Sequence, residues 1–86
     1  MSLYDAFLNS VPATGTLFDA RIKSLVMDYA GYQVDPPTMD YMVEHARAMH
    51  HIGQIEQELA SLGVDINEVS STAWAKYREA QPAVTA

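Results

Sequence analysis

Three histidines lie close together and could do chemistry as metal ligands. His45, His50 and His51 share one short segment, and imidazole nitrogens are common ligands of zinc. Ligands on one helix face recur three or four residues apart, whereas these histidines are five and one apart, so they point in separate directions from a helix. The chain has neither a Glu-x-x-His nor a His-x-x-x-His pair, and it has no cysteine. We therefore expect no metal site, no cofactor and no disulfide.

A second polar set offers acid–base chemistry. Asp40, Glu44 and His51 fall on one face of a predicted helix, with Arg47 beside them. On a helix surface such a set is more often a solvated network of ion pairs, and no nucleophile is positioned near it. The sequence also lacks a glycine-rich phosphate loop and a nucleophile elbow. We therefore predict that the chain is not an enzyme.

The charge of the chain limits its partners. Eleven acidic residues against five basic ones give a net charge of −6, and such a field repels nucleic acid and anionic lipid. Between Ser24 and Ala46 every charge is acidic. No apolar run approaches the ~20 residues of a membrane-spanning helix, and the first residues lack the basic start of a secretory signal. We expect a cytoplasmic protein that binds neither nucleic acid nor membranes.

The periodicity of the sequence predicts an all-α fold, a small bundle of about four helices. Its 86 residues suffice for one domain, expected at residues 1–80, followed by a flexible tail at residues 81–86. The first helix is capped by Ser2 with Asp5 and ends near Asn9. The second begins at Thr16, with Asp19 three residues on, and ends at Gly31. Its core stripe contains Phe18, Ile22, Leu25, Val26 and Tyr29.

The third helix is expected to be the longest. Asp35 serves as its N-cap with Pro36 at the first position, and the helix ends at Leu62 before Gly63. The fourth helix starts at Asp65, and Glu68 stands at the capping-box spacing. Its apolar stripe contains Ile66, Val69, Ala73, Tyr77 and Ala80. The short turn at residues 63–64 predicts that the third and fourth helices form an antiparallel hairpin.

The apolar face of the long helix changes direction halfway along. Its second half gathers Ile52, Ile55, Leu59 and Leu62 on one side, which we expect to pack on the fourth helix. Its first half gathers Met39, Met42, Val43, Ala46 and Met49 on nearly the opposite side. This methionine-rich face packs either on the second helix or on another molecule, and we favour the core because methionine commonly fills cores.

Small residues recur every seven positions along the same helix. Ala46, Gly53 and Ala60 would let another helix approach closely. The approach is either a tight crossing within the chain, which we favour because so few heptads are weak evidence, or a homodimer contact.

Trp74 lies at the edge of the fourth helix's apolar stripe, beside Tyr77 and near Arg78. It is either a flank of the core under the first helix, which we favour, or an interface anchor, since tryptophan, tyrosine and arginine dominate binding hot spots. Met27 and Leu17 point away from their stripe and are weaker interface candidates.

Three functional hypotheses follow from these features. The leading one is a non-enzymatic interaction protein, such as an assembly factor, an adaptor or an accessory subunit, which uses the methionine-rich face. The first alternative is a structural component that self-assembles through the small residues, as a homo-oligomer or in a particle or virion. The second alternative is an acidic inhibitor of a nucleic-acid enzyme, suggested by the acidic segment.

Overall fold

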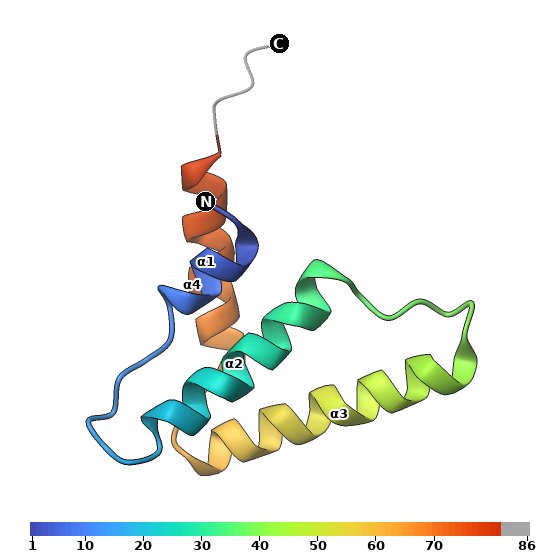
Figure 1. Cartoon of the computed structure of the whole chain (residues 1–86), viewed down its shortest axis with the longest axis horizontal. Coiled ribbons are helices and arrows are strands. Elements are labelled where there is room, and N and C mark those ends of the chain that lie inside the picture. The colour runs from blue at the N-terminus through green and yellow to red at the C-terminus, as the bar shows by residue number, and fades with distance from the viewer. Residues whose placement is uncertain (82–86) are drawn as a thin grey trace.

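The computed structural model describes residues 1–81, and these residues form four helices and no strand. The helices are α1 (Leu3–Leu8), α2 (Asp19–Val34), α3 (Met42–Ser61) and α4 (Ile66–Ala80). The prediction of an all-α fold is confirmed. Of the predicted tail, all but Gln81 lies outside the described residues. In Figure 1, α2 and α3 cross obliquely, α4 rises from their lower end, and α1 lies against α4 and above α2.

Helix α1 has only six residues and depends on packing for its stability. Its predicted cap is confirmed: the Ser2 hydroxyl accepts a hydrogen bond from the Asp5 amide at 3.1 Å, and the Asp5 carboxylate accepts one from the Ser2 amide at 3.2 Å. The buried ring of Phe7 packs beside that of Tyr29, with the ring centroids 6.0 Å apart. α1 therefore docks on α2 and α4 of its own chain.

Helix α2 begins and ends three residues later than predicted. The Asp19 carboxylate accepts hydrogen bonds from the amides of Thr14 and Gly15, so the residues before Asp19 form a separate turn. Gly31 does not adopt a positive φ, and its carbonyl accepts a hydrogen bond from the Asp35 amide at 3.0 Å. The helix therefore continues through Gly31 to Val34.

Helix α3 begins at Met42, so the predicted start at Asp35 and Pro36 is wrong. Pro36, the predicted first helical residue, precedes Pro37, and steric clash with the Pro37 ring disfavours helical geometry at Pro36. Residues 35–41 consequently form an irregular connection.

The predicted end of α3 is confirmed in detail. Gly63 has a φ of +81°, and its amide donates to the Ala60 carbonyl at 3.1 Å. The Val64 amide donates to the Leu59 carbonyl at 2.8 Å, which completes a Schellman motif. Asp65 then caps α4 by accepting from the Asn67 amide, although Glu68 forms no reciprocal bond in the described structure.

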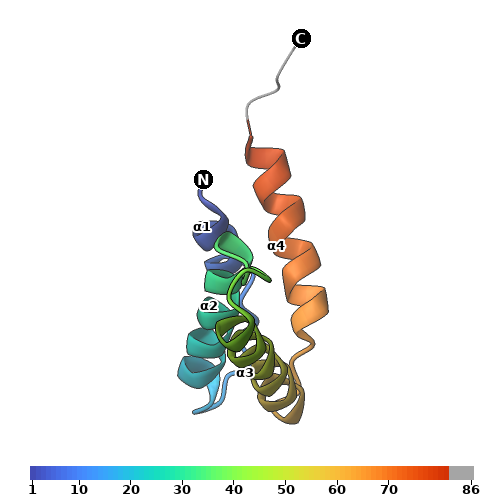
Figure 2. The same ribbon diagram turned by 90° about the vertical axis from the view of Figure 1, so that its right-hand side faces the viewer.

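The predicted antiparallel hairpin of α3 and α4 is not evident. Figures 1 and 2 show α4 rising away from α3 after the turn. α3 packs more closely on α2, and α4 packs more closely on α1, than α3 and α4 pack on each other. Val64 in the turn and Ile66 at the start of α4 are buried, so the turn itself is packed against the core.

The core lies where α1, α2 and α4 meet the second half of α3. All its buried residues are apolar: Leu3, Ala6, Phe7, Ile22, Leu25, Val26, Tyr29, Ala30, Ile55, Leu59, Val64, Ile66, Val69 and Ala73. The predicted stripes of α2 and α4 are confirmed except at their ends. Phe18 is exposed because it precedes the first turn of α2, Tyr77 is half-buried, and Ala80 is exposed in the last turn of α4.

Candidate interaction surface

The two halves of α3 have opposite surroundings. In the second half Ile55 and Leu59 are fully buried, mainly against α2, and Ile52 and Leu62 are half-buried. In the first half Met42 is 75% exposed and Met49 is 49% exposed. Our preferred interpretation of the methionine-rich face as core is therefore wrong. The second half, which we expected to pack on α4, contacts α4 but packs more extensively on α2.

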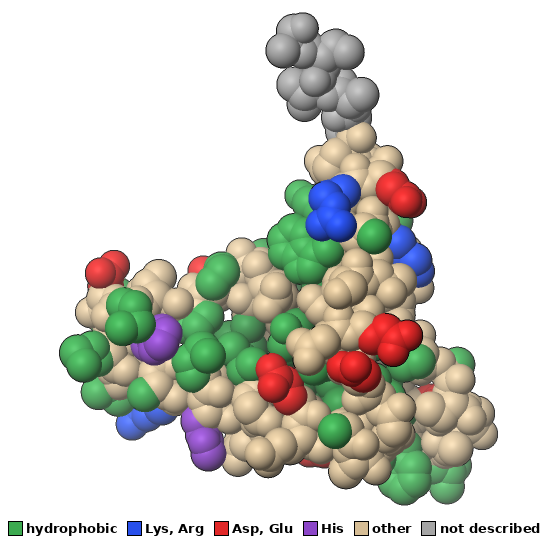
Figure 3. Space-filling view, turned by 180° about the vertical axis from the view of Figure 1, so that it is seen from behind, with side chains coloured by type: hydrophobic (Ala, Val, Ile, Leu, Met, Phe, Trp, Pro, Cys, Tyr) green, Lys and Arg blue, Asp and Glu red, His purple; other side chains and the backbone are tan. Residues whose placement is uncertain are grey.

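The physical reason is the place where α2 ends. Figure 1 shows the first turns of α3 extending past the end of α2, with only the connection at residues 35–41 beside them. Met39 in that connection and Val43 in α3 are also exposed. Figure 3 shows hydrophobic side chains gathered over this projecting end, with histidine and basic side chains next to them.

One stripe of α3 is uncovered from end to end, and we call it the open face. Its members follow one another at alternating spacings of four and three residues, and none of them is buried: Met42, Ala46, Met49, Gly53, Glu56 and Ala60. A methyl group built at Gly53 would meet no atom within 4 Å. The predicted tight crossing within the chain is therefore wrong, because no helix approaches Gly53.

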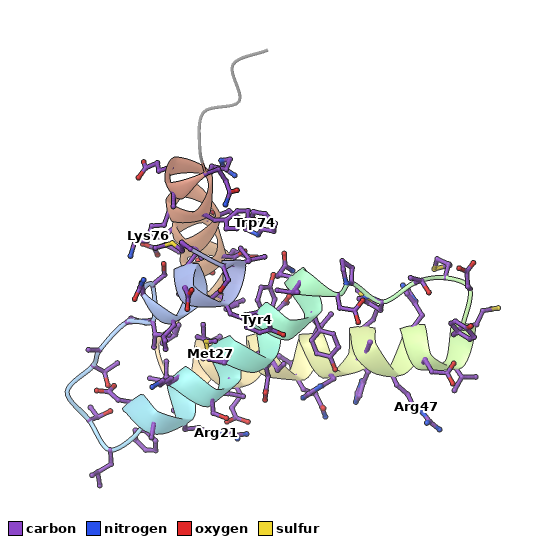
Figure 4. All side chains as sticks on the ribbon, turned by 45° about the horizontal axis from the view of Figure 1, so that its top comes forward. Tyr4, Arg21, Met27, Arg47, Trp74 and Lys76 are labelled. Carbon is purple, nitrogen blue, oxygen red and sulfur yellow. The ribbon has the colours of Figure 1, made fainter. Side chains whose placement is uncertain are left out.

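The open face carries one charged residue, Glu56, in its second half. His45 and His50 flank its first half on the helix surface. Arg47 falls nearly on the opposite side of α3, and Figure 4 shows it extending into solvent.

The predicted ion-pair network around Arg47 does not form in the described structure. Asp40 precedes α3 and so is not on a helix face. His51 is instead hydrogen-bonded through Nδ1 to the Tyr32 hydroxyl at 2.7 Å. The ion pair that does form joins Arg21 of α2 to Glu58 of α3, with Nη2 and Oε1 2.9 Å apart.

The carboxyl groups with shifted pKa values all lie away from the open face. Hydrogen bonds from Ser2 lower the pKa of Asp5, and those from Thr14 lower the pKa of Asp19. The hydrogen bond from Arg21 lowers the pKa of Glu58. Each shift is explained by a cap, a turn or an ion pair on the surface, so none of these groups indicates a catalytic centre.

Trp74 and Tyr77 do not join the α3 residues in one site. Both are half-buried against the core, and their rings meet edge to face with centroids 5.8 Å apart. The Trp74 indole nitrogen donates to the Gln33 side chain at 3.3 Å, beside a shallow hollow that borders α1. Figure 4 shows Trp74 on α4, far from Arg47. The position of Trp74 agrees with a flank of the core.

Met27 and Leu17, the other two interface candidates, differ in how exposed they are. Met27 is half-buried against the core, whereas Leu17 is 99% exposed in the turn before α2.

Sequence reasoning missed one residue of the exposed apolar end. Tyr41 is 68% exposed and directly precedes Met42. The signal was present, because four of the five residues from Met39 to Val43 are large and apolar. The predicted third helix includes this run, and on a helix its alternate residues point to different sides.

The described residues contain no group of three histidine, cysteine, aspartate or glutamate side chains arranged to hold a metal ion. Within the same residues, none of the helices combines the length and the hydropathy that spanning a bilayer requires. The chain matches no protein-family model, no curated protein and no solved structure.

Proposed function

We propose that this chain is a small, non-enzymatic interaction protein of the cytoplasm, an adaptor, assembly factor or accessory subunit. It binds a protein partner through the projecting first half of α3. The observation that carries this proposal is the exposure of Met42, Val43 and Met49 on one helix that the fold leaves uncovered. Contiguous exposed apolar side chains of this kind mark interaction sites in soluble proteins.

The chemistry of the exposed residues suits binding. A helix that presents apolar residues at spacings of three and four docks in an apolar groove or along another helix. Methionine adapts its shape to the partner because its side chain is unbranched and flexible. Fully burying such a side chain contributes about 1.5–3 kcal/mol, and Met42, which is mostly exposed, stands to gain much of that on binding.

Two features support a role other than catalysis. The buried side chains in the described residues are hydrophobic, and Tyr29 is the one among them that carries a hydroxyl, so the interior of the described residues holds no carboxylate, imidazole or amine. The titratable groups with shifted pKa values are exposed and are explained by local hydrogen bonds.

A comparison of three baits tests the proposal. The baits are the wild-type chain, a Met42→Glu/Met49→Glu variant, and a Ser24→Glu/Ser71→Glu control that adds the same charge at exposed positions of α2 and α4. We expect the wild type and the control to retain the same protein from an extract of the source cells. The methionine variant should lose that protein while its helical circular dichroism stays unchanged. Equal retention by all three baits, or unfolding of the methionine variant, contradicts the proposal.

A further inference from the structure

We propose that a second copy of this chain covers the open face of α3, with the two α3 helices antiparallel. In this arrangement Met42 lies over Ala60 of the partner subunit, and Met49 lies over Gly53 of the partner subunit. The inference rests on the proposed function and specifies the partner.

The sizes of the side chains along the open face are complementary to themselves. Its first half carries the large residues Met42 and Met49, and its second half carries the small residues Gly53 and Ala60. The alternating spacing of four and three residues is that of helices packed side by side. A two-fold axis across an antiparallel pair brings the first half of one helix against the second half of the other. Every methionine is then opposite a glycine or an alanine.

The surface is also hollowed where a methionine would arrive. An open, mainly apolar hollow lies at the end of α3 beside the start of α4, and Ala60, Val64 and Ile66 are among its lining residues. It adjoins the open face, because Glu56 and Ala60 both line it. In the proposed pair this hollow receives Met42 of the partner subunit.

The one charged residue of the open face favours the antiparallel arrangement. In the antiparallel register Glu56 lies over Ala46 of the partner subunit and so stands apart from Glu56 of the partner subunit. A parallel pair would instead place Glu56 against Glu56 of the partner subunit, where like charges repel.

Gly53→Leu tests the contact at the centre of the pair. In the single chain there is open space at Gly53, so a leucine fits without disturbing the fold. In the pair the leucine would occupy the place of the partner's Met49. We expect sedimentation equilibrium to show a dimer for the wild type and a dissociation constant at least about tenfold higher for Gly53→Leu. The matched control is Gln54→Leu, next to Gly53 but off the open face, which should leave the dimer intact.

Cysteine cross-linking tests the register, because the chain contains no cysteine of its own. Met49→Cys and Gly53→Cys are prepared with tags of different size, mixed, and oxidised. The antiparallel pair predicts a disulfide between the two variants in preference to disulfides within either one. Preferential joining of each variant to itself indicates a parallel pair and overturns the proposal.

The outcome for self-pairing is separable from that for the proposed function. A wild-type chain that stays monomeric at millimolar concentration overturns the pairing. If the three baits still differ in that case, the face binds a different protein and only the pairing fails. If the baits do not differ either, both proposals fail.

Discussion

The contrast between the two halves of α3 predicts opposite effects for two substitutions on the same helix. Leu59→Ala removes a side chain that is fully buried in the core, whereas Met42→Ala removes one that is 75% exposed. Leucine-to-alanine changes in cores cost about 2–5 kcal/mol of the free energy of unfolding, because they lose both burial and packing. Surface changes stay within about 0.5 kcal/mol.

These magnitudes are large compared with the stability expected of so small a domain. At about 0.05–0.15 kcal/mol per residue, the whole chain is stabilised by only about 4–13 kcal/mol. Leu59→Ala should therefore lower the urea midpoint by more than about 1 M, or leave the chain largely unfolded. Met42→Ala should leave the midpoint nearly unchanged.

The assay is urea unfolding followed by circular dichroism, at two low protein concentrations. Low concentration matters because self-association raises the apparent stability of the wild type by mass action. A concentration-independent loss of about 2 kcal/mol or more in Met42→Ala would refute our reasoning, because it would place the methionine-rich face in the core of the single chain. A loss that disappears on dilution would instead report the dimer.

Three further predictions concern the glycines, the cap of α4 and the ion pair. A methyl group meets no neighbour at Gly53 or at Gly63, but only Gly63 has a positive φ. Urea unfolding should therefore show that Gly53→Ala stabilises the dilute chain by up to about 1 kcal/mol and that Gly63→Ala destabilises it by about 1–2 kcal/mol. Asp65→Ala should cost about 1 kcal/mol in the same assay, because the Asn67 amide loses its acceptor. Arg21 lowers the pKa of Glu58 below its ordinary 4.5, so the stability that this group contributes is present above pH 4.5 and is lost as the pH falls through the folded value. Thermal melting between pH 2.5 and 6 should show a smaller acid-induced loss for Glu58→Gln, and an unchanged profile would contradict this assignment.

Local signals in the sequence predicted several features of the fold correctly. The spacing of Ser2 and Asp5 predicts a capping box, and Gly63 after Leu62 predicts the end of the long helix; both are confirmed. These features depend on a few neighbouring residues. The core stripes of α2 and α4 were also predictable, because each is a periodic pattern within one helix.

The errors arose where the outcome depends on distant segments or on competing local effects. The Asp35–Pro36 pair resembles a helix start, but Pro37, which follows it, disfavours helical geometry at Pro36. The direction of α4 depends on how Val64 in the turn and Ile66 at the start of α4 fit the core, which the length of the turn does not determine. The periodicity of α3 predicted that its two halves have different apolar faces. It could not predict which half is covered, because that depends on where α2 ends.

The two faces of α3 link binding to folding. Leu59 anchors the second half of the helix in the core, whereas Met42 in the first half is held by little besides the helix itself. A helical segment without tertiary contacts is only marginally stable in water. A partner that covers the open face therefore adds the contacts that the first half lacks, and because one helix spans both regions, this stabilises the whole domain. If the proposed function holds, the domain is therefore more stable when bound than when free.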